Sequence, residues 1–199
     1  MKRAPFSPPL LVLTDGAATG GRPLVEVVAA ALEGGARAVL LREKHLPRSE
    51  RAELAAEIGR LLTAIGGVLL VASDNSLPAD GLHLAAGEPL PSPPPPLTGR
   101  SCHSRAEVEM AAREGCDYAT LSPIFPTPSK PGYGPPLGPD VLDGLPLPVL
   151  ALGGVDEENA PACMKAGAAG VAVMGAVMRA PDPATVVAHL VDELEVALR

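Results

Sequence analysis

The chain has 199 residues, of which 47% are hydrophobic, and this is enough to bury the core of a single domain spanning residues 1–199. Its formal net charge of −7, with scattered positive residues, argues against a surface for nucleic acid or anionic membrane and favours small-molecule partners. Three widely spaced cysteines predict neither a disulfide framework nor a structural zinc site, and without a signal-peptide pattern or ~20 successive apolar residues we expect a cytoplasmic protein.

Eight short apolar runs have the length and composition of buried β-strands. They are residues 10–14, 38–43, 68–73, 81–85, 99–103, 118–124, 149–153 and 170–175. Between them, apolar residues recur three and four positions apart with charges on the other face, which predicts amphipathic helices. The predicted helices are residues 23–33, 49–65, 105–114, 157–165 and 183–198.

Alternation of strands and helices indicates an α/β fold with a parallel sheet. Eight strands favour a single compact (β/α)8 TIM barrel, and a doubly wound sheet is the alternative. Two connections are abbreviated, because residues 75–80 are too few for a full helix and residues 87–99, GEPLPSPPPPLTG, form a proline-rich loop.

Active sites of such barrels lie at the carboxyl ends of the strands. The last two predicted strands end near glycines, with Gly153 and Gly154 at one end and Met174 and Gly175 at the other. Glycine lets an anion approach backbone N–H groups, and the loops after strands seven and eight are the recurrent phosphate site of this fold. We expect a phosphate here, although glycines also serve simply to turn a chain.

Two cations end the second predicted strand. Alternation along a strand places Arg42 and Lys44 on one side and Glu43 on the other. A guanidinium with paired donors and a neighbouring ammonium suit a multiply charged phosphate, so we expect both at the mouth of the barrel.

Two carboxylates follow the third and fourth strands. Asp74, preceded by Ser73, and Glu88 have the hard oxygens that Mg²⁺ prefers, and a bound phosphate would supply further ligands. Lone carboxylates also serve as caps or solvated loop charges, so both interpretations stay open.

On the fifth strand, Cys102 and His103 point to opposite faces because they are sequence neighbours, and they make a poor nucleophile–base pair. The side chains of this strand that we expect to face the pocket are Ser101 and His103. The other histidines are interpreted as a satisfied core residue, a loop residue and a helix-surface residue: His83, His45 and His189.

The segment 121–139, LSPIFPTPSKPGYGPPLGP, begins as a strand and continues as a stiff loop. Prolines fix φ, so the loop is expected to enter the site already ordered and to lose less entropy on binding. It would bring Thr127, Ser129 and Lys130 to the mouth.

The sequence resembles the thiamine phosphate synthase/TenI superfamily over nearly its whole length. The segments that carry the resemblance, in order, are LVLTD, LLREK, ADGLHL, GRSCHS, DYATLSPIFPTPSK, PVLALGGV and AGAAGVAVMGAV. The combination of REK with PIFPTPSK and a late GG is specific to this superfamily.

Synthases of this superfamily join a hydroxymethylpyrimidine diphosphate to a thiazole phosphate and release pyrophosphate. The resemblance implies that Mg²⁺ and cations stabilise the departing pyrophosphate while the thiazole nitrogen attacks, which needs no general base. It implies these roles: Arg42, Lys44 and Lys130 at the pyrophosphate with Ser101 nearby, Asp74 and Glu88 at the metal, and Thr127, Ser129, Gly153, Gly154 and Gly175 around phosphate. The implied partners are these two small molecules, without nucleic acid or membrane, and self-association into a homo-oligomer stays open.

Four positions depart from the synthase pattern on the pyrimidine side. The family's Gln, Asn, Gln and Asp are replaced by Leu40, Ser73, Ala86 and Glu88. Each lost hydrogen bond to substrate would cost about 1–3 kcal/mol.

Two alternatives to a synthase therefore stay open. One is a TenI-like thiazole tautomerase with His103 as proton carrier, because the SCHS segment resembles that of the TenI branch. Those enzymes, however, carry a His where this chain has Pro123. The other is a non-catalytic barrel that binds thiazole phosphate for regulation.

Overall fold

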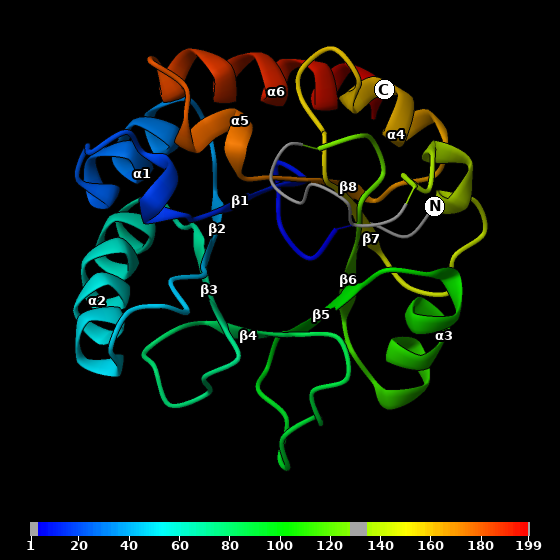
Figure 1. Cartoon of the computed structure of the whole chain (residues 1–199), viewed down its shortest axis with the longest axis horizontal. Coiled ribbons are helices and arrows are strands. Elements are labelled where there is room, and N and C mark those ends of the chain that lie inside the picture. Colours follow the sequence, from blue (N-terminus) through cyan, green and yellow to red (C-terminus); the bar gives the residue numbers. More distant parts are fainter. Residues whose placement is uncertain (1–3, 128–134, 199) are drawn as a thin grey trace.

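A computed structural model describes residues 4–127 and 135–198. It contains a closed barrel of eight parallel strands in sequence order (Figure 1). The strands are β1 (Leu10–Leu13), β2 (Ala38–Leu41), β3 (Val68–Ala72), β4 (Gly81–Leu84), β5 (Thr98–Cys102), β6 (Tyr118–Leu121), β7 (Val149–Leu152) and β8 (Gly170–Val173). The predicted (β/α)8 barrel is confirmed, and each strand lies within two residues of its predicted bounds except β6, which is three residues shorter at its end.

Helices surround the barrel in Figure 1. They are α1 (Leu24–Glu33), α2 (Arg48–Ala64), α3 (Arg105–Glu114), α4 (Ala160–Lys165), α5 (Gly175–Met178) and α6 (Pro183–Ala197), with 3-10 turns η1 (Gly16–Ala18) and η2 (Pro139–Leu142). The prediction of a helix from residue 157 was wrong by three residues. Asp156 Oδ1 accepts the N–H groups of Glu158 and Asn159, and this turn holds residues 157–159 outside the helix.

The sector outside β4 and β5 carries loops instead of helices (Figure 1), as the short connections predict. Arg100 on β5 points outward into this sector, where its side chain is 7% exposed. Its Nη2 donates to Glu114 Oε2 at 2.7 Å, and its Nη1 donates to the carbonyl oxygen of Glu88 at 2.7 Å. This buried guanidinium therefore ties the proline-rich connection to the barrel.

Alternation along the strands divides the core into an inner and an outer cluster. Leu11, Leu13 and Leu40 belong to the inner cluster, whereas Leu10 and Val12 pack outward under the helices. The same alternation carries Arg42 and Lys44 into the barrel mouth beyond Leu40.

Tyr118 fills the centre of the barrel and is fully buried. Gly99 on the adjacent strand leaves room for its ring, because a Cβ at Gly99 would overlap with Tyr118 Cζ. Phe6, in the segment before β1, meets the ring of Tyr118 edge-on with centroids 6.1 Å apart. The inner cluster thus ends in a rigid aromatic layer beneath the cavity described below.

Within the described ranges, no helix has the length and apolar character needed to cross a membrane.

Candidate active site

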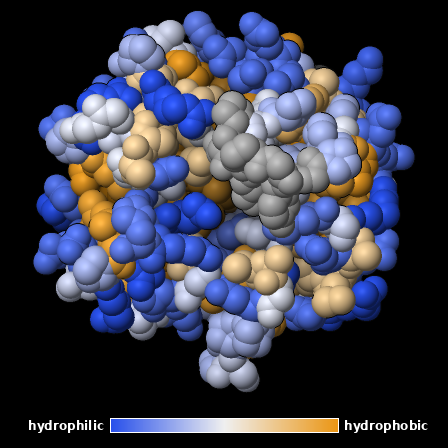
Figure 2. Space-filling view, in the orientation of Figure 1, coloured by the Kyte–Doolittle hydropathy of each residue, from blue (hydrophilic) through white to orange (hydrophobic). Residues whose placement is uncertain are grey.

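A cavity of about 880 Å³ opens at the carboxyl ends of the strands, and its size is that of a small-molecule site. In the space-filling view, hydrophilic residues gather at the centre of this face (Figure 2). The structure places most of the predicted site residues in the cavity wall: Arg42, Lys44, Ser101, His103, Thr127, Gly153, Gly154, Met174 and Gly175.

The end of β2 is fixed by a buried carboxylate. Both oxygens of Glu43, which is 1% exposed, accept the N–H of Gly16 at 3.1 Å. The N–H of Arg42 donates to Thr14 Oγ1 at 2.9 Å. Glu43 points away from the cavity, as the predicted alternation requires, and holds Arg42 and Lys44 on the cavity side.

The glycines after β7 allow the next loop to approach closely. Gly153 and Gly154 have φ values of 91° and 68°, which glycine adopts without strain. A Cβ at Gly153 would lie 2.8 Å from Pro123 Cα, and one at Gly154 would overlap with the carbonyl oxygen of Pro126. The glycine pair therefore serves packing against the loop after β6 and, at the same time, lines the cavity.

Arg179, directly after α5, is a cation in the cavity wall that we did not predict. The guanidinium of Arg179 lies against Gly175, where a Cβ would overlap with its Nη2. Arg179 is exposed and lines the cavity. In the part of the chain that the structure describes, its side chain has no ion pair and no hydrogen bond.

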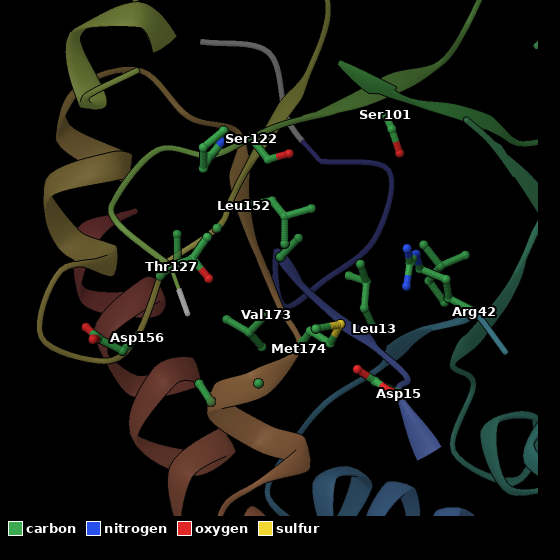
Figure 3. Close-up of a pocket in the computed structure, with 18 of the residues that line it drawn as sticks. Leu13, Asp15, Arg42, Ser101, Ser122, Thr127, Leu152, Asp156, Val173 and Met174 are labelled. Carbon is green, nitrogen blue, oxygen red and sulfur yellow. The ribbon is translucent and has the colours of Figure 1, made fainter. Parts of the chain in front are cut away.

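Figure 3 shows the cavity wall from within. Thr127 and Asp156 lie across the cavity from Arg42 and Ser101, and the apolar side chains of Leu13, Leu152 and Val173 lie between them. The cavity thus has two polar ends separated by an apolar middle.

His83, which we interpreted as structural, lines this cavity as well. Its Nδ1 lies 2.9 Å from the Tyr118 hydroxyl and its Nε2 lies 3.0 Å from Ser101 Oγ. Burial, with the charges of Lys44, Arg42 and Arg100, lowers the pKa of His83 to about 3, so the ring is neutral at neutral pH. Its hydrogen bonds are satisfied, as expected of a structural residue, and its side chain also forms part of the cavity wall.

His103 lines the cavity on the other side of Ser101. Its Nδ1 donates to the carbonyl oxygen of Ser122 at 2.9 Å, so a neutral His103 carries its lone pair on Nε2. Cys102 points into the outer core, and burial raises the pKa of its thiol to about 12. Cys102 is therefore an inert core residue, in agreement with the predicted opposite faces.

The two proposed metal ligands lie beside the cavity but do not line it. Asp74 Oδ2 pairs with Arg51 Nη2 at 3.1 Å, and its other oxygen accepts the N–H of Ser76. Hydrogen bonding from the Ser76 side chain is the main cause that lowers the pKa of Asp74. Glu88 Oε2 accepts from Ser73 Oγ at 2.9 Å and from the N–H of Ala85, a cavity residue, at 2.7 Å.

Ser129 and Lys130 lie outside the described residues, so their predicted roles stay predictions. Among the positions that depart from the synthase pattern, Leu40 and Ala86 line the cavity, whereas Ser73 does not. In the residues that the structure covers, no group of three or more His, Cys, Asp or Glu side chains is arranged to hold a metal ion by itself.

Comparisons with known proteins agree on one family. A family model described as thiamine monophosphate synthase matches residues 10–177. A protein of Geobacter sulfurreducens named as a candidate thiamine-phosphate synthase is 43% identical, over 92% of this chain and 92% of its own length. The thiamine-phosphate synthase of Roseiflexus castenholzii is 38% identical, over 91% of this chain and 86% of its own.

Among solved structures, thiamine phosphate pyrophosphorylase from Pyrococcus furiosus is similar with a TM-score of 0.83 and 29% identity. The match covers 96% of both chains.

Proposed function

The chain belongs to the thiamine monophosphate synthase family, and we propose that it joins hydroxymethylpyrimidine diphosphate to thiazole phosphate with release of pyrophosphate. The observation that carries this proposal is the two-ended cavity. Arg42 lies at one end and Thr127 at the other (Figure 3). Lys44 lines the cavity two residues after Arg42, and the glycines after β7 and β8 line it together with Arg179. Two phosphorylated substrates can lie in it with their rings meeting over the apolar middle.

The end of β2 suits the diphosphate. Arg42 offers paired N–H donors and Lys44 a point charge, and Glu43 fixes both without neutralising them inside the cavity. Ser101 lies on this side, and Lys130 and Ser129 are proposed to approach the same substrates. These cations stabilise the charge that develops on the departing pyrophosphate.

The end formed by β7 and β8 suits the single phosphate of the thiazole. Gly153, Gly154 and Gly175 leave the backbone accessible, and Met174 and Thr127 flank it. Arg179 adds a guanidinium directly over Gly175. The phosphate there would hold the thiazole ring over the apolar middle of the cavity.

The reaction is a displacement at the methylene carbon of the pyrimidine. The carbon–oxygen bond to the diphosphate breaks, and the pyrophosphate leaves with its electron pair. The lone pair of the thiazole nitrogen forms the new carbon–nitrogen bond, which leaves a thiazolium cation. No proton moves, so charge stabilisation and positioning are the tasks of the protein.

Mg²⁺ is the cofactor that we propose, held by Asp74 and Glu88. Their carboxylate oxygens are the ligands that Mg²⁺ prefers, and Glu88 is bonded to Ala85 in the cavity wall. When bound, the ion would neutralise part of the diphosphate charge. Arg51 pairs with Asp74 Oδ2 at 3.1 Å, so this guanidinium competes with a metal for that oxygen.

A second candidate is the tautomerase, and one observation favours it. His103 lies in the cavity wall, and its Nδ1 donates to the carbonyl oxygen of Ser122, which orients an imidazole of the type that carries protons. Pro123 occupies the position where those enzymes carry a His, and it also lines the cavity. Because Pro123 cannot transfer a proton, this position favours the synthase reaction over the tautomerase reaction.

Purified protein with Mg²⁺ and both substrates tests the proposal, with thiamine phosphate and pyrophosphate measured by chromatography. We expect both products in equal amounts. Arg42→Gln is expected to lower kcat/KM by about 10- to 150-fold, the value of one charge-assisted hydrogen bond. Arg60→Gln, an exposed arginine on α2, is the matched control and keeps full activity.

If no thiamine phosphate forms although both substrates bind, the chain is not a synthase. A changed isomer ratio after incubation with the thiazole carboxylate phosphate would then support the tautomerase. Binding of thiazole phosphate without turnover in either assay would identify a non-catalytic binder.

A further inference from the structure

A buried row of polar side chains runs from the barrel centre to the cavity wall. Tyr118 Oη lies 2.9 Å from His83 Nδ1, and His83 Nε2 lies 3.0 Å from Ser101 Oγ. Thr120 Oγ1, at 3.4 Å from Nε2, is the weaker partner of the imidazole. His83 and Ser101 both line the cavity, and Ser101, which is partly exposed, is the end of the row on the cavity side.

The row is held rigidly by its surroundings. Tyr118 is fully buried, with Phe6 on one side and the backbone of Gly99, which has no side chain to displace the ring, on another. Its ring centroid lies 5.5 Å from that of His83. Side chains packed in this way keep one rotamer, so the two hydrogen bonds are present before a ligand arrives.

The imidazole of His83 is neutral because of its burial and the cations around it. Arg42, Lys44 and Arg100 are the charges that act on it, and all of them disfavour protonation. A neutral imidazole carries one N–H donor and one acceptor nitrogen. The two short contacts must therefore run in the same direction, either from Tyr118 toward Ser101 or from Ser101 toward Tyr118.

The two directions differ in which hydroxyl hydrogen is left over. If Ser101 donates to His83 and His83 donates to Tyr118, the phenol hydrogen stays at the barrel centre, where the described residues offer it no other acceptor. Leaving a buried donor unsatisfied costs about 1–3 kcal/mol. In the opposite direction, the leftover hydrogen belongs to Ser101, which faces the cavity and can meet water or ligand.

We infer that Tyr118 donates to Nδ1 of His83, that Nε2–H of His83 donates to Ser101, and that Ser101 is thereby fixed as a hydrogen-bond donor toward the cavity. Tyr118 and His83 are positioning residues, and Ser101 is a specificity-determining contact. Its hydroxyl hydrogen is then available to the cavity, which favours an acceptor atom there, either a ring nitrogen or a diphosphate oxygen. The identity of this acceptor rests on the proposed function, because it belongs to the pyrimidine diphosphate.

The tautomer of His83 tests the direction on the ligand-free protein. Imidazole ¹⁵N NMR, with signals assigned by loss in His83→Gln, is expected to show a protonated Nε2 and an unprotonated Nδ1. Neither signal should change between about pH 5 and 8, because the pKa of His83 is about 3. A protonated Nδ1, or titration of His83 in this range, would overturn the inference whether or not the protein is a synthase.

Tyr118→Phe removes the donor and keeps the ring that fills the barrel centre. We expect a mixture of His83 tautomers and about 5- to 10-fold weaker binding of the pyrimidine diphosphate, matched by Ser101→Ala, with no further loss in the double variant. Pyrophosphate alone, used as a second probe, is weakened equally if the acceptor is a diphosphate oxygen and is unaffected if it is a ring nitrogen. An unchanged tautomer in Tyr118→Phe, or additive losses, would contradict the proposed chain. Should this variant fail to fold, the wild-type tautomer decides alone.

Discussion

The guanidinium of Arg179 lies over Gly175, in the space that any larger residue at position 175 would occupy. We therefore predict that Arg179→Gln weakens binding of thiazole phosphate by about 10-fold or more, because one charge-assisted contact to phosphate is lost. Arg179→Lys restores part of the affinity, since a point charge replaces the paired donors. Isothermal titration calorimetry measures the change, with Arg60→Gln as control.

Gly175→Ala provides an independent check of the same contact. The added methyl group displaces Arg179 from its position, so the variant should lose about as much affinity as Arg179→Gln. The two losses should not add in the double variant, because both remove one contact. Additive losses would place Arg179 outside the phosphate site.

Removing Arg51 should favour metal binding. In Arg51→Gln the carboxylate of Asp74 loses the guanidinium 3.1 Å away, and we expect Mg²⁺ to bind up to about 5-fold more tightly, the value of a partly exposed ion pair. Calorimetric titration with Mg²⁺ in the presence of pyrophosphate gives the affinity, and Asp74→Asn should abolish the gain. Equal Mg²⁺ affinity in the wild type and in Arg51→Gln would contradict the assignment of Asp74 as a ligand.

The buried His83 should make the fold sensitive to acid. Its pKa is about 3 in the folded protein and 6.5 ordinarily, so below pH 6.5 only the unfolded chain takes up this proton. The free energy of unfolding should therefore fall by about 1.4 kcal/mol per pH unit as the pH decreases from about 6.5 toward 3, and His83 should add no slope above this range.

Urea denaturation at several pH values compares the wild type with His83→Asn, in which this slope should disappear. His189→Gln on the exposed face of α6 is the control and should keep it. If the free energy of unfolding changes equally with pH in the wild type and in His83→Asn, His83 takes up its proton in the folded protein as readily as in the unfolded chain, which would contradict the prediction.

Most of the fold could be predicted because apolar runs and helical periodicity report burial directly. The strand ends were predicted one to three residues too long, and the residues just beyond the strands explain why. The N–H of Thr14 still donates to the carbonyl oxygen of Leu40, but the N–H of Arg42 donates to the side chain of Thr14, and Ser73 takes a left-handed φ of 59°. Such local exchanges of backbone for side-chain hydrogen bonds leave little trace in a hydrophobicity pattern.

The site was predicted where strand alternation and glycine pairs fix the geometry, as for Arg42, Lys44 and Gly153. Arg179 could not be predicted, because the short helix α5 brings it back over Gly175 from four positions further along the chain. His83 was interpreted as structural within GLHLA, and the structure shows both satisfied hydrogen bonds and a place in the cavity wall, because alternation along β4 points this side chain inside the barrel. The ion pair of Asp74 with Arg51 joins residues 23 positions apart and has no local signal.

The central claim is that the cavity holds two phosphorylated substrates at opposite ends. A crystal grown with thiazole phosphate, pyrophosphate and Mg²⁺ tests it most directly. We predict the thiazole phosphate within hydrogen-bond distance of Arg179 and the backbone near Gly175, and pyrophosphate beside Arg42 and Lys44. Pyrophosphate absent from Arg42 and Lys44 while thiazole phosphate is fully occupied, or both ligands competing for the Gly175 end, would contradict the account.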